Sequence, residues 1–146
     1  MQIKPKKSLG QNFLINSEII EKIINCVKID HHVNILEVGP GSGNLTKEII
    51  SKNPKSLHVV EKDKNLCDLL NAKFNKDIKV INNDILNVKL NDFDCGKFII
   101  FGNLPYNIST QILVNWILYN YNFTSIKKLV LMFQKEVADR ILSKVN

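Results

Sequence analysis

The residues with the clearest chemical potential lie in "FGNLPYNIST" at 101–110, after the apolar run "KFIIF". An amide, a rigid Leu-Pro step and a ring stand where a buried strand should end: Asn103, Leu104, Pro105 and Tyr106. The side-chain oxygen of Asn103 and the carbonyl of Leu104 can each accept a hydrogen bond, and the ring of Tyr106 offers a stacking face. Alone, this stretch could be a turn that ends a strand, so its meaning depends on residues upstream.

A glycine-rich segment, "LEVGPGSGNLT" at 36–46, follows one predicted strand and opens a predicted helix. Gly39, Gly41 and Gly43 can turn the chain tightly and let a ligand approach the backbone. Their spacing is G-x-G-x-G, whereas a dinucleotide fingerprint would need glycine where Asn44 stands. A P-loop is excluded because no G-K-[ST] is present.

Acidic residues end the next two predicted strands. Glu61 lies about twenty residues beyond the glycines, where a carboxylate can accept hydrogen bonds from both ribose hydroxyls. Asp84 ends the following strand, and Ile85 beside it can pack an adenine ring. Read singly, Glu61 would be a solvated charge and Asp84 a turn cap. With the glycines they predict a pocket for adenine, ribose and an amino-acid tail. S-adenosylmethionine fits better than a nucleotide, since no lysine in the glycine segment could hold phosphates.

A methyl donor in that pocket gives the 103–106 stretch a role. An exocyclic adenine amine is a poor nucleophile because its lone pair is delocalised into the ring. Acceptors from Asn103 and Leu104 would favour a pyramidal nitrogen whose lone pair points at the methyl group. Pro105 would keep the carbonyl aimed, and Tyr106 would hold an unpaired base by stacking. This chemistry needs no general base with a perturbed pKa.

Composition limits the class of protein. The 146 residues suit one domain, and the net charge of +6 comes from lysines apart from Arg140. These lysines could contact a polyanion or simply solvate helix faces, and charge alone does not decide. Without a membrane-spanning run or an apolar secretory signal, we expect a cytoplasmic protein. Cys26, Cys67 and Cys95 predict neither a disulfide nor a metal site and are expected to be small buried hydrophobes.

Apolar runs alternate with segments of helical spacing. Strands are predicted at 33–39, 56–62, 78–84, 97–103 and 127–133, and helices at 17–27, 44–52, 64–74, 109–120 and 134–142. Ser17 and Ser109 stand at expected N-caps. The alternation predicts an α/β fold, a parallel sheet with helices on both faces and a ligand crevice beyond the carboxyl ends of the strands.

Several motifs together resemble the ribosomal RNA adenine dimethyltransferases of KsgA type. These motifs are "KKSLGQNFL" (6–14), "EVGPGSGNLT" (37–46), "VEKD" (60–63), "NNDIL" (82–86), "GNLPYNIS" (102–109) and "QKEVADRI" (134–141). The resemblance covers essentially the whole chain, and "LGQNFL" combined with "NLPYNIS" is far more specific than any glycine motif.

The resemblance implies a Rossmann-like class I S-adenosylmethionine-dependent methyltransferase. It would dimethylate N6 of two adjacent adenosines near the 3′ end of small-subunit (16S) ribosomal RNA, in the pre-30S particle, as a monomer. Cofactor contacts are implied for Asn12, Leu14, Gly39, Glu61, Asp84 and Asn103, to which the residue pattern itself adds Gly41 and Ile85. The segment around Gln11 and Asn12 would close over the cofactor, and Lys4, Lys6 and Lys7, with Tyr106, would meet the RNA.

The family also predicts more chain than is present. Its members continue with the remaining strands of the sheet and a small helical C-terminal domain, so we expect 1–146 to be an S-adenosylmethionine-binding domain incomplete at its C-terminus. The strand at 127–133 should then be an exposed edge.

Three alternatives remain open. Methylases of large-subunit ribosomal RNA that confer macrolide resistance share this core. A non-catalytic RNA-binding module for ribosome assembly could keep the fold without methyl transfer, although intact Asn103–Tyr106, Glu61 and Asp84 argue against that loss. A nicotinamide-dependent dehydrogenase is disfavoured by the glycine spacing.

Overall fold

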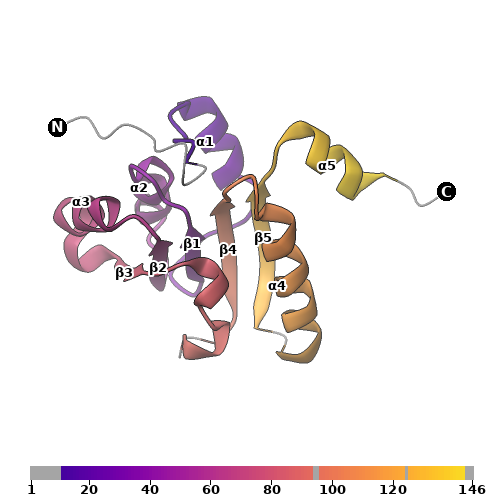
Figure 1. Ribbon diagram of the computed structural model, residues 1–146. Helices are drawn as coiled ribbons and strands as arrows, with labels where there is room; N and C mark the ends of the chain where they lie inside the picture. Colours follow the sequence, from indigo (N-terminus) through magenta and orange to yellow (C-terminus); the bar gives the residue numbers. More distant parts are fainter. Residues whose placement is uncertain (1–10, 94–95, 124, 144–146) are drawn as a thin grey trace.

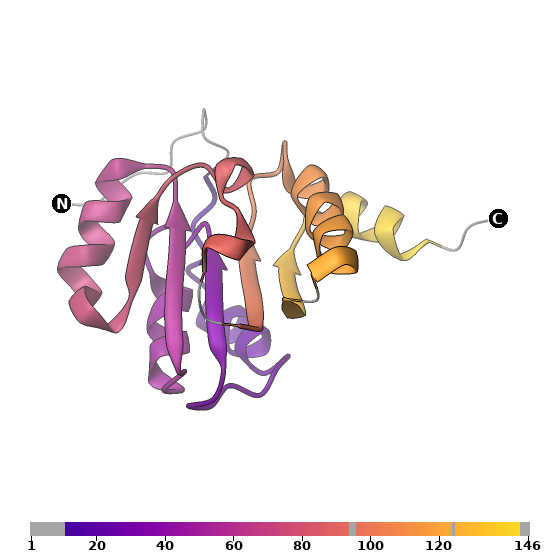
Figure 2. The same ribbon diagram turned by 90° about the horizontal axis from the view of Figure 1, so that it is seen from below.

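The chain folds around one parallel β-sheet, and the computed structural model describes residues 11–93, 96–123 and 125–143. The five strands have the spatial order β3-β2-β1-β4-β5. Figure 1 and Figure 2 show the sheet with helices on both sides. The strands are β1 (Asn34–Val38), β2 (Ser56–Glu61), β3 (Lys79–Asn82), β4 (Phe98–Asn103) and β5 (Ile126–Met132). Each predicted strand is confirmed, as is the α/β class.

Alternating side chains of the central strands build a core on each face of the sheet. Ile35 and Ile99 point to one face, where they pack with α1, α2 and α3. Leu36 and Ile100 point to the other, where they pack with α4 and the short helices η3 and η4. The helices are α1 (Ser17–Ile24), α2 (Asn44–Ser51), α3 (Lys64–Phe74), η2 (Asn75–Asp77), η3 (Ile85–Asn87), η4 (Leu90–Asp92), α4 (Ser109–Phe123) and α5 (Lys135–Leu142).

Both predicted N-caps are wrong by one residue. The side chain of Asn16, not Ser17, caps α1 by accepting a hydrogen bond from the Ile19 amide at 3.1 Å. Asn and Ser are comparable caps, so their adjacency left the boundary ambiguous. Ser109 is likewise the first residue of α4, and its hydroxyl donates to the Tyr106 carbonyl at 3.3 Å.

Of the two cysteines that the structure describes, one is buried as predicted and the other is exposed. Cys67 is buried as expected, but Cys26 is exposed just beyond α1, where its thiol donates to the Lys22 carbonyl. The prediction for Cys26 is therefore wrong: α1 turns Ile23 and Ile24 to the core and ends at Ile24, so Cys26 follows the helix and stays exposed. Cys95 lies outside the described residues.

At one side of the sheet, β5 pairs only with β4 among the described strands, which agrees with the expected edge. None of the helices in the described ranges is long and apolar enough to cross a bilayer.

Candidate active site at the carboxyl ends of the strands

A cavity of about 180 Å³ lies where β1, β2, β3 and β4 end. It is lined by most of the residues that the sequence singles out, together with part of the N-terminal segment: Gln11, Asn12, Phe13, Val38, Gly39, Gly41, Val60, Glu61, Lys62, Asn83, Asp84, Ile85, Leu86, Asn103, Pro105, Asn107 and Ile108. Parallel strands bring their carboxyl ends to one edge, so residues far apart in sequence meet there. Leu14, Leu104 and Tyr106 do not line it.

At the end of β1, the glycine-rich turn packs closely against the end of β4 and against the N-terminal segment. Gly39 has a φ of +70°, and a Cβ there would stand only 2.6 Å from the Asn103 carbonyl oxygen. Gly41 faces the Phe13 ring, 2.9 Å from an added Cβ. Both glycines are thus required for close approach, but the space beside them is taken by β4 and by the N-terminal segment. Gly39 and Gly41 also line the cavity, so the approach of a ligand to their backbone stays a prediction.

Glu61 is buried at the end of β2 and is not the solvated charge that its sequence context suggests. Its Oε1 accepts a hydrogen bond from the Asp63 amide at 3.0 Å. Burial raises the pKa of Glu61, and hydrogen bonds from the Asp63, Gly41 and Lys62 amides oppose that rise. The backbone of two loops therefore fixes this carboxylate at the cavity wall.

Asp84 combines two roles at the end of β3. Its Oδ1 accepts from the Leu86 amide at 3.0 Å and so caps η3, while Oδ2 accepts from Lys62 Nζ at 2.8 Å. The Lys62 hydrogen bond is the main cause that lowers the pKa of Asp84. Sequence reasoning missed Lys62, although its place after Glu61 in "EKDK" puts it at the same edge as Asp84.

The N-terminal segment clasps the stretch at 103–106. Asn103 Nδ2 donates to the Asn12 carbonyl at 2.6 Å, and Asn12 Nδ2 donates to the Tyr106 hydroxyl at 2.6 Å. The first bond fixes the Asn103 amide plane, which leaves its oxygen as an acceptor toward the cavity. We call residues 11–14 with these two bonds the clasp. Sequence reasoning did not foresee a partner for the Tyr106 hydroxyl.

Other bonds tie the clasp to the cofactor side of the cavity. Gln11 Nε2 donates to Asp63 Oδ2 at 3.3 Å, and Asn44 Nδ2 donates to the Leu14 carbonyl at 2.8 Å. Leu14 thus holds the glycine-rich turn through its backbone, outside the cavity. Lys4, Lys6 and Lys7 lie outside the described residues.

Leu104 and Pro105 are adjacent in sequence, but one packs in the core and the other lines the cavity. The Leu104 side chain is buried in the core under α4, whereas Pro105 lines the cavity and its carbonyl accepts from the Ile108 amide at 3.1 Å. No hydrogen bond from a described residue reaches the Leu104 carbonyl. This carbonyl and the Asn103 side-chain oxygen are therefore adjacent acceptors without described donors.

A second buried glutamate lies beneath the glycine turn. Glu37 is 1% exposed, and burial raises its pKa to about 8. Its Oε2 and the nearby Thr46 hydroxyl accept or donate no hydrogen bond within the described part of the chain. Sequence reasoning treated Glu37 only as part of a strand, yet an acidic residue in a strand buried on both faces could have revealed it.

A sequence model described as "Ribosomal RNA adenine dimethylase" matches residues 2–146. The chain belongs to this family. It is 56% identical over its whole length to "Ribosomal RNA small subunit methyltransferase A" of Pelagibacter ubique and covers 55% of that protein. The chain thus spans about half the length of the curated relatives it matches.

Two solved structures share this fold. A dimethyladenosine transferase from Plasmodium falciparum is 29% identical, with a TM-score of 0.77 over 92% of this chain and 47% of that one. The 23S rRNA methyltransferase ErmE is 28% identical, with a TM-score of 0.75 over 88% and 50%. The predicted family and its Rossmann-like class I methyltransferase fold are confirmed.

Proposed function

We propose that this chain is the cofactor-binding and catalytic part of a ribosomal RNA adenine N6,N6-dimethyltransferase. Its cofactor is S-adenosylmethionine, and its substrate is a pair of adjacent adenosines near the 3′ end of small-subunit ribosomal RNA in the pre-30S particle. Residues 1–146 form the cofactor-binding domain of a cytoplasmic, monomeric enzyme. The small-subunit assignment is supported by the names of two relatives that are 56% and 45% identical to this chain.

The residues around the cavity fit S-adenosylmethionine. The fixed carboxylate of Glu61 is an acceptor suited to ribose hydroxyls, and the Asp84 carboxylate suits a polar edge of adenine beside the apolar Ile85. Asn12, Gly39 and Gly41 would enclose the amino-acid end, with Leu14 supporting the turn from behind. The bound cofactor would supply an electrophilic methyl group at the Asn103 end of the cavity.

The single observation that carries the proposal is the orientation of the Asn103 amide. Because its nitrogen is engaged by the Asn12 carbonyl, its oxygen stays available to accept one N6–H of adenine. The Leu104 carbonyl accepts the other, which holds the amine with its lone pair directed at the methyl group. Pro105 stiffens this turn, and the half-exposed ring of Tyr106 stacks on the base.

Transfer of labelled methyl groups from S-adenosylmethionine tests the proposal. Small ribosomal subunits that lack adenine dimethylation should accept methyl groups, and large subunits should not. Labelling of large subunits alone would favour the macrolide-resistance activity instead. Cofactor affinity from calorimetry, measured on the same preparation, separates an RNA-binding module from an enzyme. A chain that binds RNA but neither binds S-adenosylmethionine nor transfers methyl groups would contradict the proposal.

A further inference from the structure

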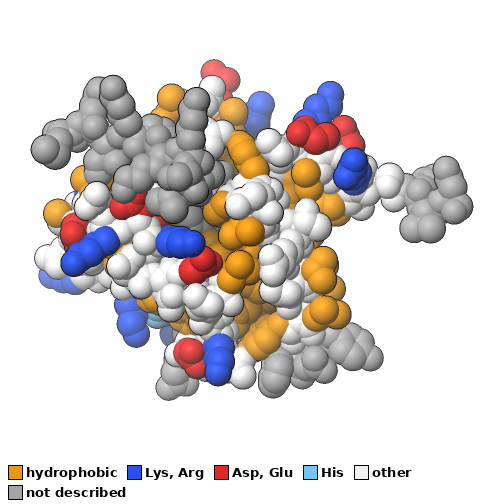
Figure 3. Space-filling model, viewed as in Figure 1, with side chains coloured by type: hydrophobic (Ala, Val, Ile, Leu, Met, Phe, Trp, Pro, Cys, Tyr) orange, Lys and Arg blue, Asp and Glu red, His pale blue; other side chains and the backbone are white. Residues whose placement is uncertain are grey.

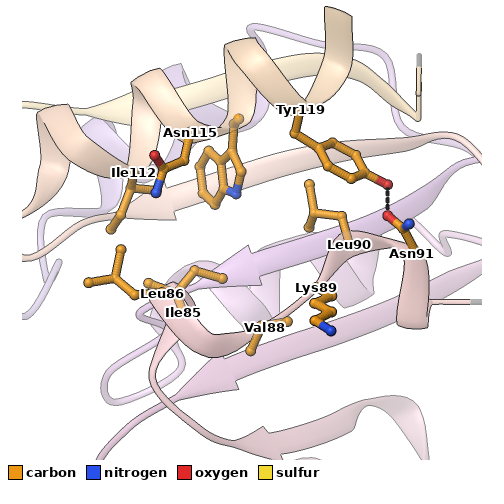
Figure 4. A pocket seen from close by; sticks show the side chains of 10 residues that line it. Ile85, Leu86, Val88, Lys89, Leu90, Asn91, Ile112, Asn115 and Tyr119 are labelled. Carbon is orange, nitrogen blue, oxygen red and sulfur yellow. Dashed lines mark hydrogen bonds between the residues drawn. The ribbon is translucent and has the colours of Figure 1, made fainter. Parts of the chain in front are cut away.

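A second cavity lies behind the candidate active site, between α4 and the segment that follows β3. Its volume is about 350 Å³, and it is lined by Ile85, Leu86, Val88, Lys89, Leu90, Asn91, Ile112, Asn115, Trp116 and Tyr119. Figure 3 shows a hollow beside α4 with hydrophobic side chains gathered around it. In Figure 4, side chains of η3 and η4 face those of α4 across this space. We call it the α4 cavity.

The walls of the α4 cavity are apolar and fixed. Ile85, Leu90 and Ile112 belong to the core beneath the sheet, so the walls do not have to form when a ligand arrives. Two opposed apolar walls that are already in place make a slot suited to a flat body. Leu86 adds an apolar side chain that is 38% exposed at the cavity.

Polar groups give the slot a chemical preference. Trp116 is 5% exposed, and its indole N–H makes no hydrogen bond with a residue that the structure describes. This N–H is not among the buried polar groups left without a partner, so solvent reaches it, and a ligand in the cavity that carries an acceptor can receive its hydrogen bond. The Asn115 amide lies at the rim, and the hydrogen bond from the Tyr119 hydroxyl to Asn91 borders the cavity (Figure 4).

Charge at the rim points to a phosphate beside that flat body. Lys89 lines the cavity, is exposed and forms no ion pair within the described ranges. A planar heterocycle with hydrogen-bond acceptors, joined to a phosphate, is a nucleotide.

The position of the α4 cavity connects it to the candidate active site. Ile85 and Leu86 line both cavities, so a thin wall separates them. Helix α4 begins three residues after Tyr106 and carries Ile112, Asn115 and Trp116 away from it. A strand of RNA that presents one base at Tyr106 can therefore reach the α4 cavity with a neighbouring one.

We propose that the α4 cavity binds an unstacked nucleobase of the RNA strand that flanks the methylated adenosine. The Trp116 indole N–H donates a hydrogen bond to the base, the Asn115 amide forms hydrogen bonds with the edge of the base, and Lys89 contacts its phosphate. This inference rests on the proposed function and adds a second point of substrate recognition to it. A free nucleoside has the same chemistry, so the experiment must distinguish these two sources.

Trp116 is the only tryptophan of the chain, so its emission reports directly on the α4 cavity. The probe is a 30-nucleotide RNA hairpin with two adjacent adenosines in its loop, titrated at saturating S-adenosylhomocysteine. Emission should change saturably with the same midpoint as RNA anisotropy. Asn115→Ala and Lys89→Gln should each weaken RNA binding about 5-fold to 10-fold. Gln111→Ala on the same helix and Lys47→Gln on α2 are matched controls that should not.

Trp116→Phe keeps an aromatic wall but loses the N–H. Because this variant has no tryptophan emission, its RNA binding is followed by the fluorescence of 2-aminopurine, placed in the hairpin at each position that flanks the adenosines. One position should report burial in the parent chain, and it should lose that signal in Asn115→Ala whether or not Trp116→Phe folds. Free adenosine at millimolar concentration should leave the emission unchanged. If adenosine changes the emission and RNA does not, the cavity serves a small molecule and the inference is overturned.

The inference and the proposed function fail in different ways. If RNA binding depends on Tyr106 but leaves Trp116 emission and the Asn115→Ala affinity unchanged, only the α4 cavity is misassigned. If neither RNA binding nor methyl transfer is detected while S-adenosylhomocysteine binds, the proposed function fails and the inference fails with it.

Discussion

The two halves of the candidate active site are held in place by different means. Around Glu61 and Asp84, carboxylates bond to backbone amides of the loops at the strand ends and to the Lys62 ammonium just after β2. At Asn103 and Tyr106, the side chains bond to Asn12, which lies more than ninety residues earlier. The cofactor half is therefore built into the strand ends, whereas the methyl-acceptor half depends on the clasp.

This difference predicts which changes each half tolerates. Buried, locally fixed carboxylates should resist perturbation of the N-terminus but respond to pH and to loss of their acceptors. Exposed bonds to a distant segment contribute little to stability, so their loss should alter orientation while the fold persists. Four predictions test this contrast.

The first prediction concerns Glu37, the buried glutamate beneath the glycine turn of the cofactor half. The folded-state pKa of Glu37, about 8, exceeds the ordinary value of 4.5, so its contribution is full below pH 4.5 and is lost as pH rises through 8. Between pH 5 and 8, unfolding free energy should fall by about 3 kcal/mol relative to Glu37→Gln. Urea denaturation at several pH values measures this. Glu21→Gln, at an exposed site on α1, should keep the parent's slope, and parallel slopes for Glu37→Gln and parent would contradict a buried neutral acid.

The second prediction concerns Asn103, which supplies a hydrogen-bond acceptor in the methyl-acceptor half. Asn103→Ala should lower single-turnover methyl transfer by about 100-fold, because one of two acceptors for the adenine amine is lost where it matters most, in the transition state. RNA affinity should scarcely change, because stacking and phosphate contacts remain. A fall in cofactor affinity of similar size would show that the two halves are not separable.

The third tests the acceptor for ribose. Glu61→Ala should weaken S-adenosylmethionine binding by about 1–3 kcal/mol, since two hydroxyls lose a fixed partner. Calorimetry measures the change, and Glu48→Ala on α2 is the control. An unchanged dissociation constant would mean that Glu61 serves only the loop that its carboxylate bonds.

The fourth and smallest effect concerns the clasp. Tyr106→Ala should weaken RNA binding by loss of stacking, and Tyr106→Phe should recover most of it because the ring remains. The structure adds that Phe cannot accept from Asn12, so a residual loss of about 1 kcal/mol in transfer is expected. This residual should vanish when Asn12 is already Ala, which a double-mutant cycle tests. Additive losses would mean that the bond has no part in catalysis.

The sequence predicts the sheet better than it predicts the clasp, for a physical reason. Strand ends can be located from apolar runs that stop at polar residues, and parallel pairing then forces Gly39, Glu61, Asp84 and Asn103 to one edge. Partners such as Lys62 for Asp84 follow from the same register. The Asn12 bonds to Asn103 and Tyr106 join a segment without regular structure to a turn, and no periodicity encodes such a pairing. The misplaced cap of α1 reflects adjacent residues of comparable capping ability, Asn16 and Ser17.

Asn12 offers its carbonyl to Asn103 and its amide to Tyr106 while lining the cavity proposed for the cofactor. Thermodynamic linkage follows from this placement. Any free energy with which a bound cofactor holds Asn12 in position also favours the arrangement that receives the base, and base binding must then tighten cofactor binding by the same factor. The order in which the two ligands arrive would not alter that factor.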